Sequence, residues 1–351
     1  MEKYRIDTSK GIEFGLYSIG DHILNPHNGS KISAEKRIHE LIETAKLADK
    51  AGLDVFAVGE SHQAHFTTQA HTVILGAIAQ TTENIKIASS ATVLSTSDPV
   101  RVYEDFATID LISNGRAEIV AGRGSRIGGY SLLGYDVNYY EELFEEKMDL
   151  LLKISKEESV TWKGQFRTPL EHATIIPRAK NNNMPIWRAV GGPPASAIKA
   201  GHAGVPMMLT TLGGPAINFK VSVDAYREAA EQSGFDPATL PIATTSLFYT
   251  AENSQDALSE YYPHIHAGML ALRGGGYPKQ QFTNAVDYRD VLMIGSPQQI
   301  IEKMLYQHEL FGQQRFMAQI DFGGVPFDKI EKNIELIATE IMPAVRKHIA
   351  K

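Results

Sequence analysis

Apolar positions along the chain follow two patterns that alternate from one end to the other. Short runs that are almost wholly apolar predict buried strands, and longer segments whose apolar residues recur every three or four positions predict helices. In the first such helix Ile38, Leu41 and Ala45 share one face, and Ser33 precedes it as an N-cap. The strand-like stretches are residues 12–17, 55–58, 85–94, 117–125 with its terminal turn, 185–190, 205–210, 242–249 and 316–322.

Eight strand–helix units in one chain predict an α/β fold, a (β/α)8 TIM barrel with insertions. An open doubly wound sheet is the alternative, but no composition shift or linker divides the sequence, so residues 1–351 are expected to form a single domain. The turn signal Trp162-Lys163-Gly164 and nearby prolines predict a hairpin-like excursion over residues 159–178.

The last third of the chain is harder to interpret. Residues 263–289 form a less regular region that overlaps a candidate mobile loop at 272–290, and we expect its His264 and His266 to lie at the surface. Asp328 and Glu331 have the spacing of a capping box, which predicts where the closing amphipathic helix begins.

Composition excludes several classes of function. The net charge is −7 with no basic block, which argues against nucleic acid as a partner. The 351 residues include no cysteine, so disulfides, thiolate metal sites and cysteine nucleophiles are excluded. No signal peptide or membrane-length apolar run is visible, and we expect a cytoplasmic protein.

Two predicted strands end in turns suited to an anion. The fourth strand ends in Arg123, Gly124 and Ser125, which offer a cation, backbone N–H groups and a hydroxyl. The fifth ends in Gly191 and Gly192, and a helix carrying Ser196 follows. Each turn alone is as consistent with an ordinary tight connection. Together, on neighbouring strands, they favour one phosphate held between them.

The third strand is unusual because small residues occupy it. Ser90, Ala91 and Thr92 stand where a barrel interior normally carries bulky branched side chains. Small residues leave room for a flat molecule to lie against the backbone, unless large neighbours fill the space.

Glu60 and His62 follow the second strand and are the candidate catalytic pair. A carboxylate and an imidazole at a barrel mouth can donate and accept protons, although a structural hydrogen-bonded pair is at least as common. Nearby His65 and His71 lack the carboxylates of a metal site, so no metal is expected. With no strand-end lysine and no Gly-x-Ser-x-Gly elbow, the chemistry would fall to a bound cofactor.

These residues resemble those of the bacterial luciferase-like monooxygenase family, in particular a branch of FMN-dependent type. The resemblance spans roughly residues 12 to 345 and rests on an ordered set of motifs rather than on any one of them. The matching stretches are 88–94 with 98–101, 111–116, 122–125, 133–135, 162–166, 185–192, 204–206 and 295–297.

The resemblance implies a luciferase-like barrel that holds FMN at the strand C-termini, usually in a homodimer. By position, Arg123 and Ser125 would bind the FMN phosphate together with Gly192 and Ser196. The bond between Ser90 and Ala91 corresponds to the family's non-proline cis peptide beneath the isoalloxazine ring. Residues 273–289 correspond to the mobile loop that shields the flavin from water.

The implied activity is a monooxygenase that uses reduced FMN and O2 on a small organic substrate, with reducing equivalents from a separate reductase or NAD(P)H. One residue departs from the pattern, because Ser61 stands where the luciferases have a catalytic histidine. The proton-handling role would then fall to His62. A flavin- or deazaflavin-dependent reductase, a non-catalytic flavin-binding protein and a sugar-phosphate-binding barrel stay open as alternatives.

Overall fold

Eight parallel strands close into a barrel in the computed structural model, which describes residues 1–124 and 128–350. The first and last strands pair in parallel register, Glu13 beside Arg315, and this pairing closes the ring. The prediction of a (β/α)8 barrel is confirmed. The barrel strands are β1 (Glu13–Ser18), β2 (Val55–Val58), β3 (Lys86–Ser89), β5 (Ala117–Gly122), β8 (Ile186–Val190), β9 (Met207–Thr211), β10 (Ile242–Thr250) and β12 (Arg315–Gln319).

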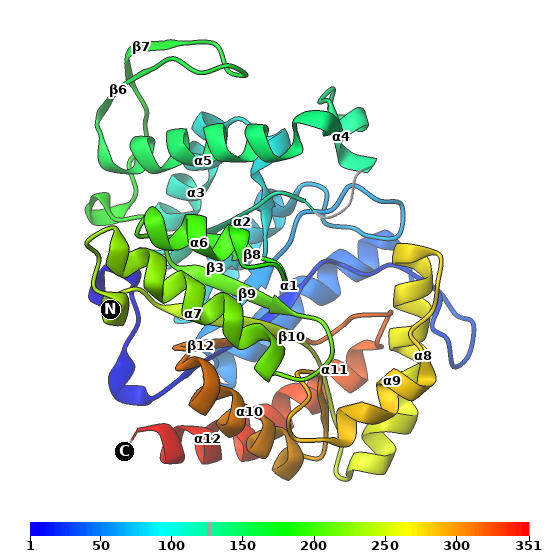
Figure 1. Ribbon diagram of the computed structural model, residues 1–351. Coiled ribbons are helices and arrows are strands. Elements are labelled where there is room, and N and C mark those ends of the chain that lie inside the picture. The colour runs from blue at the N-terminus through cyan, green and yellow to red at the C-terminus, as the bar shows by residue number, and fades with distance from the viewer. Residues whose placement is uncertain (125–127, 351) are drawn as a thin grey trace.

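Helices surround the barrel and shield its outer face (Figure 1). The helix start predicted at Ser33 is confirmed, because Ser33 Oγ accepts the N–H of Lys36 at 3.1 Å. Asp98 caps another helix by accepting the N–H of Val100 at 2.8 Å, with Pro99 at the first position. The helices between and after the barrel strands are α1 (Ala34–Lys50), α2 (His71–Thr81), α3 (Pro99–Ile112), α4 (Gly128–Leu132), α5 (Tyr140–Lys156), α6 (Ala195–His202), α7 (Ile217–Gln232), α10 (Pro297–Phe311), α11 (Phe327–Leu336) and α12 (Met342–Ile349).

Short elements extend this frame. The strands β6 (Ser159–Trp162) and β7 (Leu170–Thr174) pair antiparallel and project beyond α5 at the top of Figure 1, within the segment expected to be an excursion. Strand β4 (Thr92–Val93) pairs with β5, and β11 (Met293–Gly295) pairs with β10. Single 3₁₀ turns lie at Glu2–Tyr4, Thr8–Lys10, Leu94–Thr96, Val137–Tyr139, Lys180–Asn182, Pro237–Thr239 and Asn284–Val286.

The region predicted to be irregular is largely helical, so that expectation is wrong. Helix α8 (Ser254–Arg273) runs through Pro263, and α9 (Lys279–Thr283) follows it. Proline removes one backbone hydrogen bond, but the helix continues because its apolar face packs against the core. The same packing buries His264, whose Nδ1 lies 2.9 Å from the Gly323 carbonyl, so its expected place at the surface is also wrong.

The start of the closing helix also differs from the prediction. Helix α11 begins at Phe327 after Pro326, and no side chain caps it, so Asp328 and Glu331 do not form a capping box. Asp328 instead lies inside the first turn, where its negative charge interacts favourably with the helix dipole and stabilises the helix. A π-helical segment, Ile337–Ile341, joins α11 to α12.

Charged residues close the barrel at the N-terminal ends of its strands. Arg315 and Glu118 are fully buried and joined by hydrogen bonds of 2.6 and 3.1 Å. Arg315 also donates to Glu13 at 2.8 Å, and Trp187 Nε1 donates to Glu118 at 3.0 Å. We call Glu13, Glu118, Trp187 and Arg315 the floor cluster.

None of the helices in the described residues has the length and apolarity needed to cross a bilayer.

Candidate active site at the barrel mouth

The third strand ends early, and this opens a small-residue surface at the barrel mouth. Residues 85–94 were predicted as one strand, but they form β3 and β4 with Ser90 and Ala91 between them, and the Ser90–Ala91 peptide is cis. Neighbouring strands fix this turn: Ser90 N donates to the Val58 carbonyl at 3.1 Å, and Glu60 N donates to the Ala91 carbonyl at 3.0 Å.

Two glycines allow the strand ends to approach the turn closely. A Cβ atom at Gly59 would lie 2.3 Å from the Ser90 carbonyl oxygen, closer than any real contact. A Cβ at Gly122 would lie 2.9 Å from the Ala91 methyl group. The strand ends therefore pack directly against the Ser90–Ala91 turn, and no residue larger than glycine fits at position 59 or 122.

Glu60 and His62 form a hydrogen-bonded pair beside this surface. His62 Nε2 lies 2.7 Å from Glu60 Oε1, and the second carboxylate oxygen accepts the N–H of Val93 at 2.7 Å. Burial raises the pKa of Glu60, so a proton shared with the imidazole is held more readily than by an exposed carboxyl. The predicted pair is thus brought together and linked to β4.

His71 supports the pair from α2, a role the sequence did not indicate. Its Nε2 lies 2.8 Å from the Thr92 hydroxyl, and its Nδ1 lies 3.8 Å from Glu60 Oε2. Burial lowers the pKa of His71 to about 3, so the ring is neutral at physiological pH.

Among the described residues, no group of three or more His, Asp or Glu side chains could hold a metal ion.

A small cavity of about 20 Å³ lies next to the pair. Glu60, Ser61, His62 and Gly124 are among its lining residues. The space suits a water molecule. Ser61 is buried, and its hydroxyl has no hydrogen-bond partner in the described part of the chain, so it faces a space that a polar group could enter.

A chain of charged side chains connects the two predicted anion turns. Arg123 pairs with Glu141 of α5, and Lys199 of α6 lies 3.6 Å from the same carboxylate. Lys199 also pairs with Glu145 at 2.9 Å. We call this set, with Arg188, the cation cluster.

Arg188 completes the cation cluster from inside β8. It binds Glu145 through both terminal nitrogens, at 2.9 and 2.5 Å, and its Nε donates to the Ser196 hydroxyl at 3.0 Å. That hydroxyl is buried and keeps its own hydrogen to donate. The segments that follow the fourth and fifth barrel strands are therefore joined through the carboxylates of α5.

Not every predicted cofactor residue lies in one place. Gly124 lines the small cavity beside Glu60, whereas Gly191 and Gly192 line a larger hollow of about 560 Å³ that reaches α8. The Gly192 carbonyl accepts the hydroxyl of Ser222 at 3.0 Å, which holds the turn against α7. Ser125, predicted to contact the phosphate, lies outside the described residues.

Sequence reasoning missed Arg188, Lys199 and the acidic side chains of α5. A charged residue inside a strand-like run was one available signal for Arg188. Lys199 follows Ser196 by three positions, and Glu141 precedes Glu145 by four, so each pair shares a helix face.

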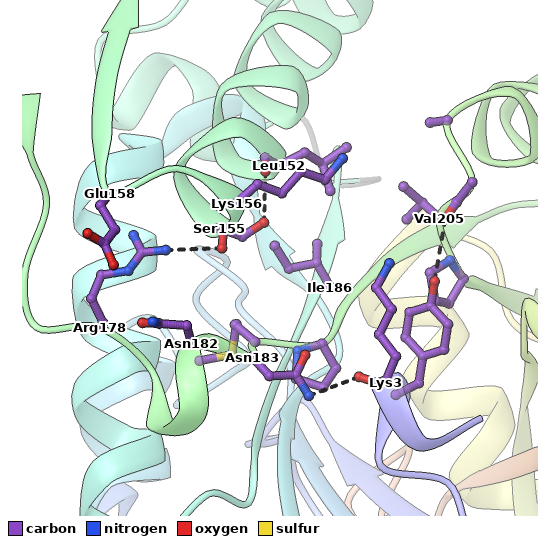
Figure 2. Close-up of a pocket in the computed structure, with 16 residues that line it drawn as sticks. Lys3, Leu152, Ser155, Lys156, Glu158, Arg178, Asn182, Asn183, Ile186 and Val205 are labelled. Atoms are coloured by element: carbon purple, nitrogen blue, oxygen red, sulfur yellow. Dashed lines mark hydrogen bonds between the residues drawn. The ribbon is translucent and has the colours of Figure 1, made fainter. Parts of the chain in front are cut away.

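Another hollow lies at the opposite end of the barrel and is not a candidate. Figure 2 shows it beside Lys3 and Asn183, near the residues that begin β8. There Asn183 donates to the Lys3 carbonyl at 3.1 Å, and Arg178 donates to the Ser155 carbonyl at 3.0 Å. These contacts tie chain segments together, and barrel enzymes place their chemistry at the other end.

The family model described as luciferase-like monooxygenase matches residues 20–314. The chain belongs to this family. It is therefore a luciferase-like, flavin-dependent oxidoreductase with a TIM-barrel fold.

Curated relatives of this luciferase-like protein use more than one cofactor. It is 23% identical to the oxygenase component of the flavin-dependent trigonelline monooxygenase of Acinetobacter baylyi, over 87% of this chain and 89% of that protein. It is 28% identical to the F420-dependent glucose-6-phosphate dehydrogenase of Amycolatopsis mediterranei, over 58% of this chain and 63% of that protein.

Solved structures agree on the fold. Monooxygenase RslO1 from Streptomyces bottropensis superposes with a TM-score of 0.82 at 22% identity, covering 95% of this chain and 99% of that one. The oxygenating constituent of 3,6-diketocamphane monooxygenase of Pseudomonas putida, solved in complex with FMN, gives 0.75 at 18% identity, covering 95% and 98%.

Proposed function

We propose that this luciferase-like enzyme is an FMN-dependent monooxygenase, which inserts one atom of O2 into a small organic substrate and reduces the other to water. The observation that carries the proposal is a juxtaposition at the mouth. A backbone surface at Ser90–Ala91 lies beside the Glu60–His62 pair, and the cation cluster joins the turns after β5 and β8.

The side chains present fit the two ends of FMN. The isoalloxazine ring is flat and suits a surface made by the Ser90–Ala91 backbone and the Ala91 methyl group. Glycine at positions 59 and 122 allows the neighbouring strands to approach this turn, because a larger residue there would collide with it. The phosphate is a dianion and suits Arg123, Lys199 and the hydroxyl of Ser196, with N–H groups near Gly191 and Gly192. We expect Ser125 to contribute as well.

When bound and reduced, FMN supplies the electrons for the reaction with oxygen. The protein holds the cofactor, restricts water and manages protons. His62, hydrogen-bonded to Glu60, is the proposed proton donor and acceptor, and the raised pKa of Glu60 allows the pair to keep one proton between them. Thr92 and His71 hold this pair in place.

The source of electrons is part of the proposal. The trigonelline relative is an oxygenase component, which supports a separate flavin reductase as partner, with NAD(P)H as the ultimate donor. We also infer a homodimer, as the family resemblance implies, and a location in the cytoplasm, as expected from the sequence.

Cofactor binding tests the proposal directly. The purified protein should bind FMN with a micromolar Kd, measured by quenching of flavin fluorescence. Arg123→Gln should weaken binding about tenfold, because a charge-assisted contact to the phosphate is lost. Arg101→Gln, an exposed arginine on α3 paired with Glu104, is the matched control and should bind like wild type.

Two results would contradict the proposal. The first is no FMN binding at micromolar concentration. The second is a clear preference for a deazaflavin over FMN in a parallel titration, since F420-dependent relatives define the competing cofactor.

His62→Asn should keep FMN affinity within about twofold while lowering turnover on any oxygenated substrate by roughly 10²-fold or more.

A further inference from the structure

The larger hollow at the mouth shares Gly191 and Gly192 with the proposed phosphate site, but its other lining residues have no part in the proposed FMN site. It lies between the ends of β8 and β9, helix α7 and the segment after α8, and measures about 560 Å³. We call it the side pocket. Leu212, Phe219 and Met269 give it apolar walls, while Arg273, Tyr277 and Gln281 supply polar groups.

Tyr277 is fixed in the side pocket by contacts of its own backbone and ring. Its carbonyl accepts the hydroxyl of Tyr262 at 3.2 Å and lies 3.2 Å from His266 Nδ1. Its ring meets that of Phe282 edge-on, with centroids 6.3 Å apart. The side chain is 6% exposed. The phenol is therefore held in position by the protein alone.

The hydroxyl of Tyr277 has no hydrogen-bond partner within the described chain. It lies against Gly213, where a Cβ atom would come within 2.6 Å of it, so the glycine leaves the space that the hydroxyl occupies. Burial raises the pKa of Tyr277 to about 12. At neutral pH the group therefore remains a donor, and a ligand oxygen would satisfy it.

Arg273 makes the side pocket electropositive. It ends α8, its side chain is exposed, and it makes no ion pair with the described residues. Of the described residues that line the hollow, Arg273 is the only one with a charged side chain. Its charge acts on Tyr277 and opposes the stronger effect of Asp290, a carboxylate outside the lining of the hollow. A cation and a neutral donor on residues that line the same hollow suit a carboxylate, one oxygen for each.

We propose that the side pocket binds the enzyme's substrate as a small organic carboxylate. Its anionic group lies between Arg273 and Tyr277, and its apolar body packs on Leu212, Phe219 and Met269. The identification of this ligand as the substrate rests on the proposed function, whereas the binding of a carboxylate does not.

Calorimetric titration with benzoate and its neutral analogue benzamide tests the pocket, with and without saturating FMN. Wild type should bind benzoate at least tenfold more tightly than benzamide. Arg273→Gln should lower benzoate affinity at least tenfold and leave benzamide unchanged. Tyr277→Phe should weaken both ligands about threefold, because each offers an oxygen to the hydroxyl. Arg101→Gln and Tyr288→Phe, which alter exposed residues outside the pocket, should match wild type.

Separate results would overturn the two proposals. Equal affinity for benzoate and benzamide in wild type would refute the carboxylate site. So would a loss of FMN affinity in Arg273→Gln as large as its loss of benzoate affinity, because this would assign the arginine to the cofactor's phosphate. If wild type binds benzoate with the expected variant pattern but fails to bind FMN, the carboxylate site is upheld and the proposed function fails.

Discussion

At the scale of single residues, His71 shows how a buried imidazole supports a site without carrying charge. It is 5% exposed, contacts the Thr92 hydroxyl and approaches Glu60. Protonating it would place an uncompensated charge inside the protein, which explains the direction of its pKa shift. The ring therefore acts as a neutral spacer between α2 and the mouth.

This neutrality predicts a pH dependence of stability. The unfolded histidine takes a proton near pH 6.5 and the folded one near pH 3, so between these values the unfolded state binds more protons. Stability then falls as the pH is lowered. From pH 7 to pH 5, His71 should account for about 2 kcal/mol of lost unfolding free energy. Urea titrations of wild type and His71→Gln at both pH values measure it, because the variant should lose less between them.

His348→Gln is the matched control for that measurement. This histidine lies on the exposed side of α12, so its removal should leave the pH dependence of wild type intact. If His71→Gln and wild type lose the same free energy between pH 7 and pH 5, the buried neutral histidine is not the cause.

At the scale of elements, α5 organises the phosphate end of the proposed site. Its Glu141 and Glu145, one turn apart, hold Arg123, Arg188 and Lys199 near one another. Without these carboxylates the three cations would repel. Since Glu141 is about half exposed, its contact with Arg123 is weak enough for a bound phosphate to replace it.

This arrangement predicts that Glu141 competes with the cofactor. Glu141→Gln should tighten FMN binding about threefold at low salt, with a smaller effect at high salt because exposed charges are screened. Fluorescence titration at two ionic strengths provides the measurement, and Glu142→Gln on the same helix is the control. Weaker binding by Glu141→Gln would mean that the carboxylate positions Arg123 rather than competing for it.

Sequence pattern predicts elements well where a feature is local. The barrel strands were recognisable because buried parallel strands are short and apolar, and Ser33 marked its helix by side-chain chemistry alone. The path of α8 through Pro263 was not predictable in this way, because packing against the core outweighs the proline. The cation cluster depends on where α5 docks, which no local pattern contains.

At the scale of the whole molecule, the barrel separates stability from chemistry along its axis. The floor cluster lies where the strands begin, and the proposed cofactor site lies where they end. Removing one partner of a buried ion pair leaves the other uncompensated, which is usually costly. Substitutions in the floor cluster should therefore lower the free energy of unfolding and leave ligand binding at the barrel mouth unchanged.

Glu118→Gln tests this separation. The variant should lose about 3 kcal/mol of unfolding free energy, since Arg315 and Trp187 lose their charged acceptor. FMN affinity of the folded protein should stay within about twofold. Glu335→Gln, which removes an exposed partner of Lys332, should change stability by less than about 0.5 kcal/mol. A loss of FMN affinity by Glu118→Gln without loss of stability would show that the two ends are coupled.

The close contact between Gly59 and the Ser90 carbonyl also bears on how this enzyme can diversify. Because backbone meets backbone there, almost any substitution at Gly59 collides with the turn, and selection or a mutant library finds nothing usable at that position. Leu212 and Phe219 in the wall of the side pocket carry no such constraint, since they are only partly buried. Under the two proposals made above, new substrates are therefore reached by changing Leu212 or Phe219, while the surface proposed for the flavin stays the same.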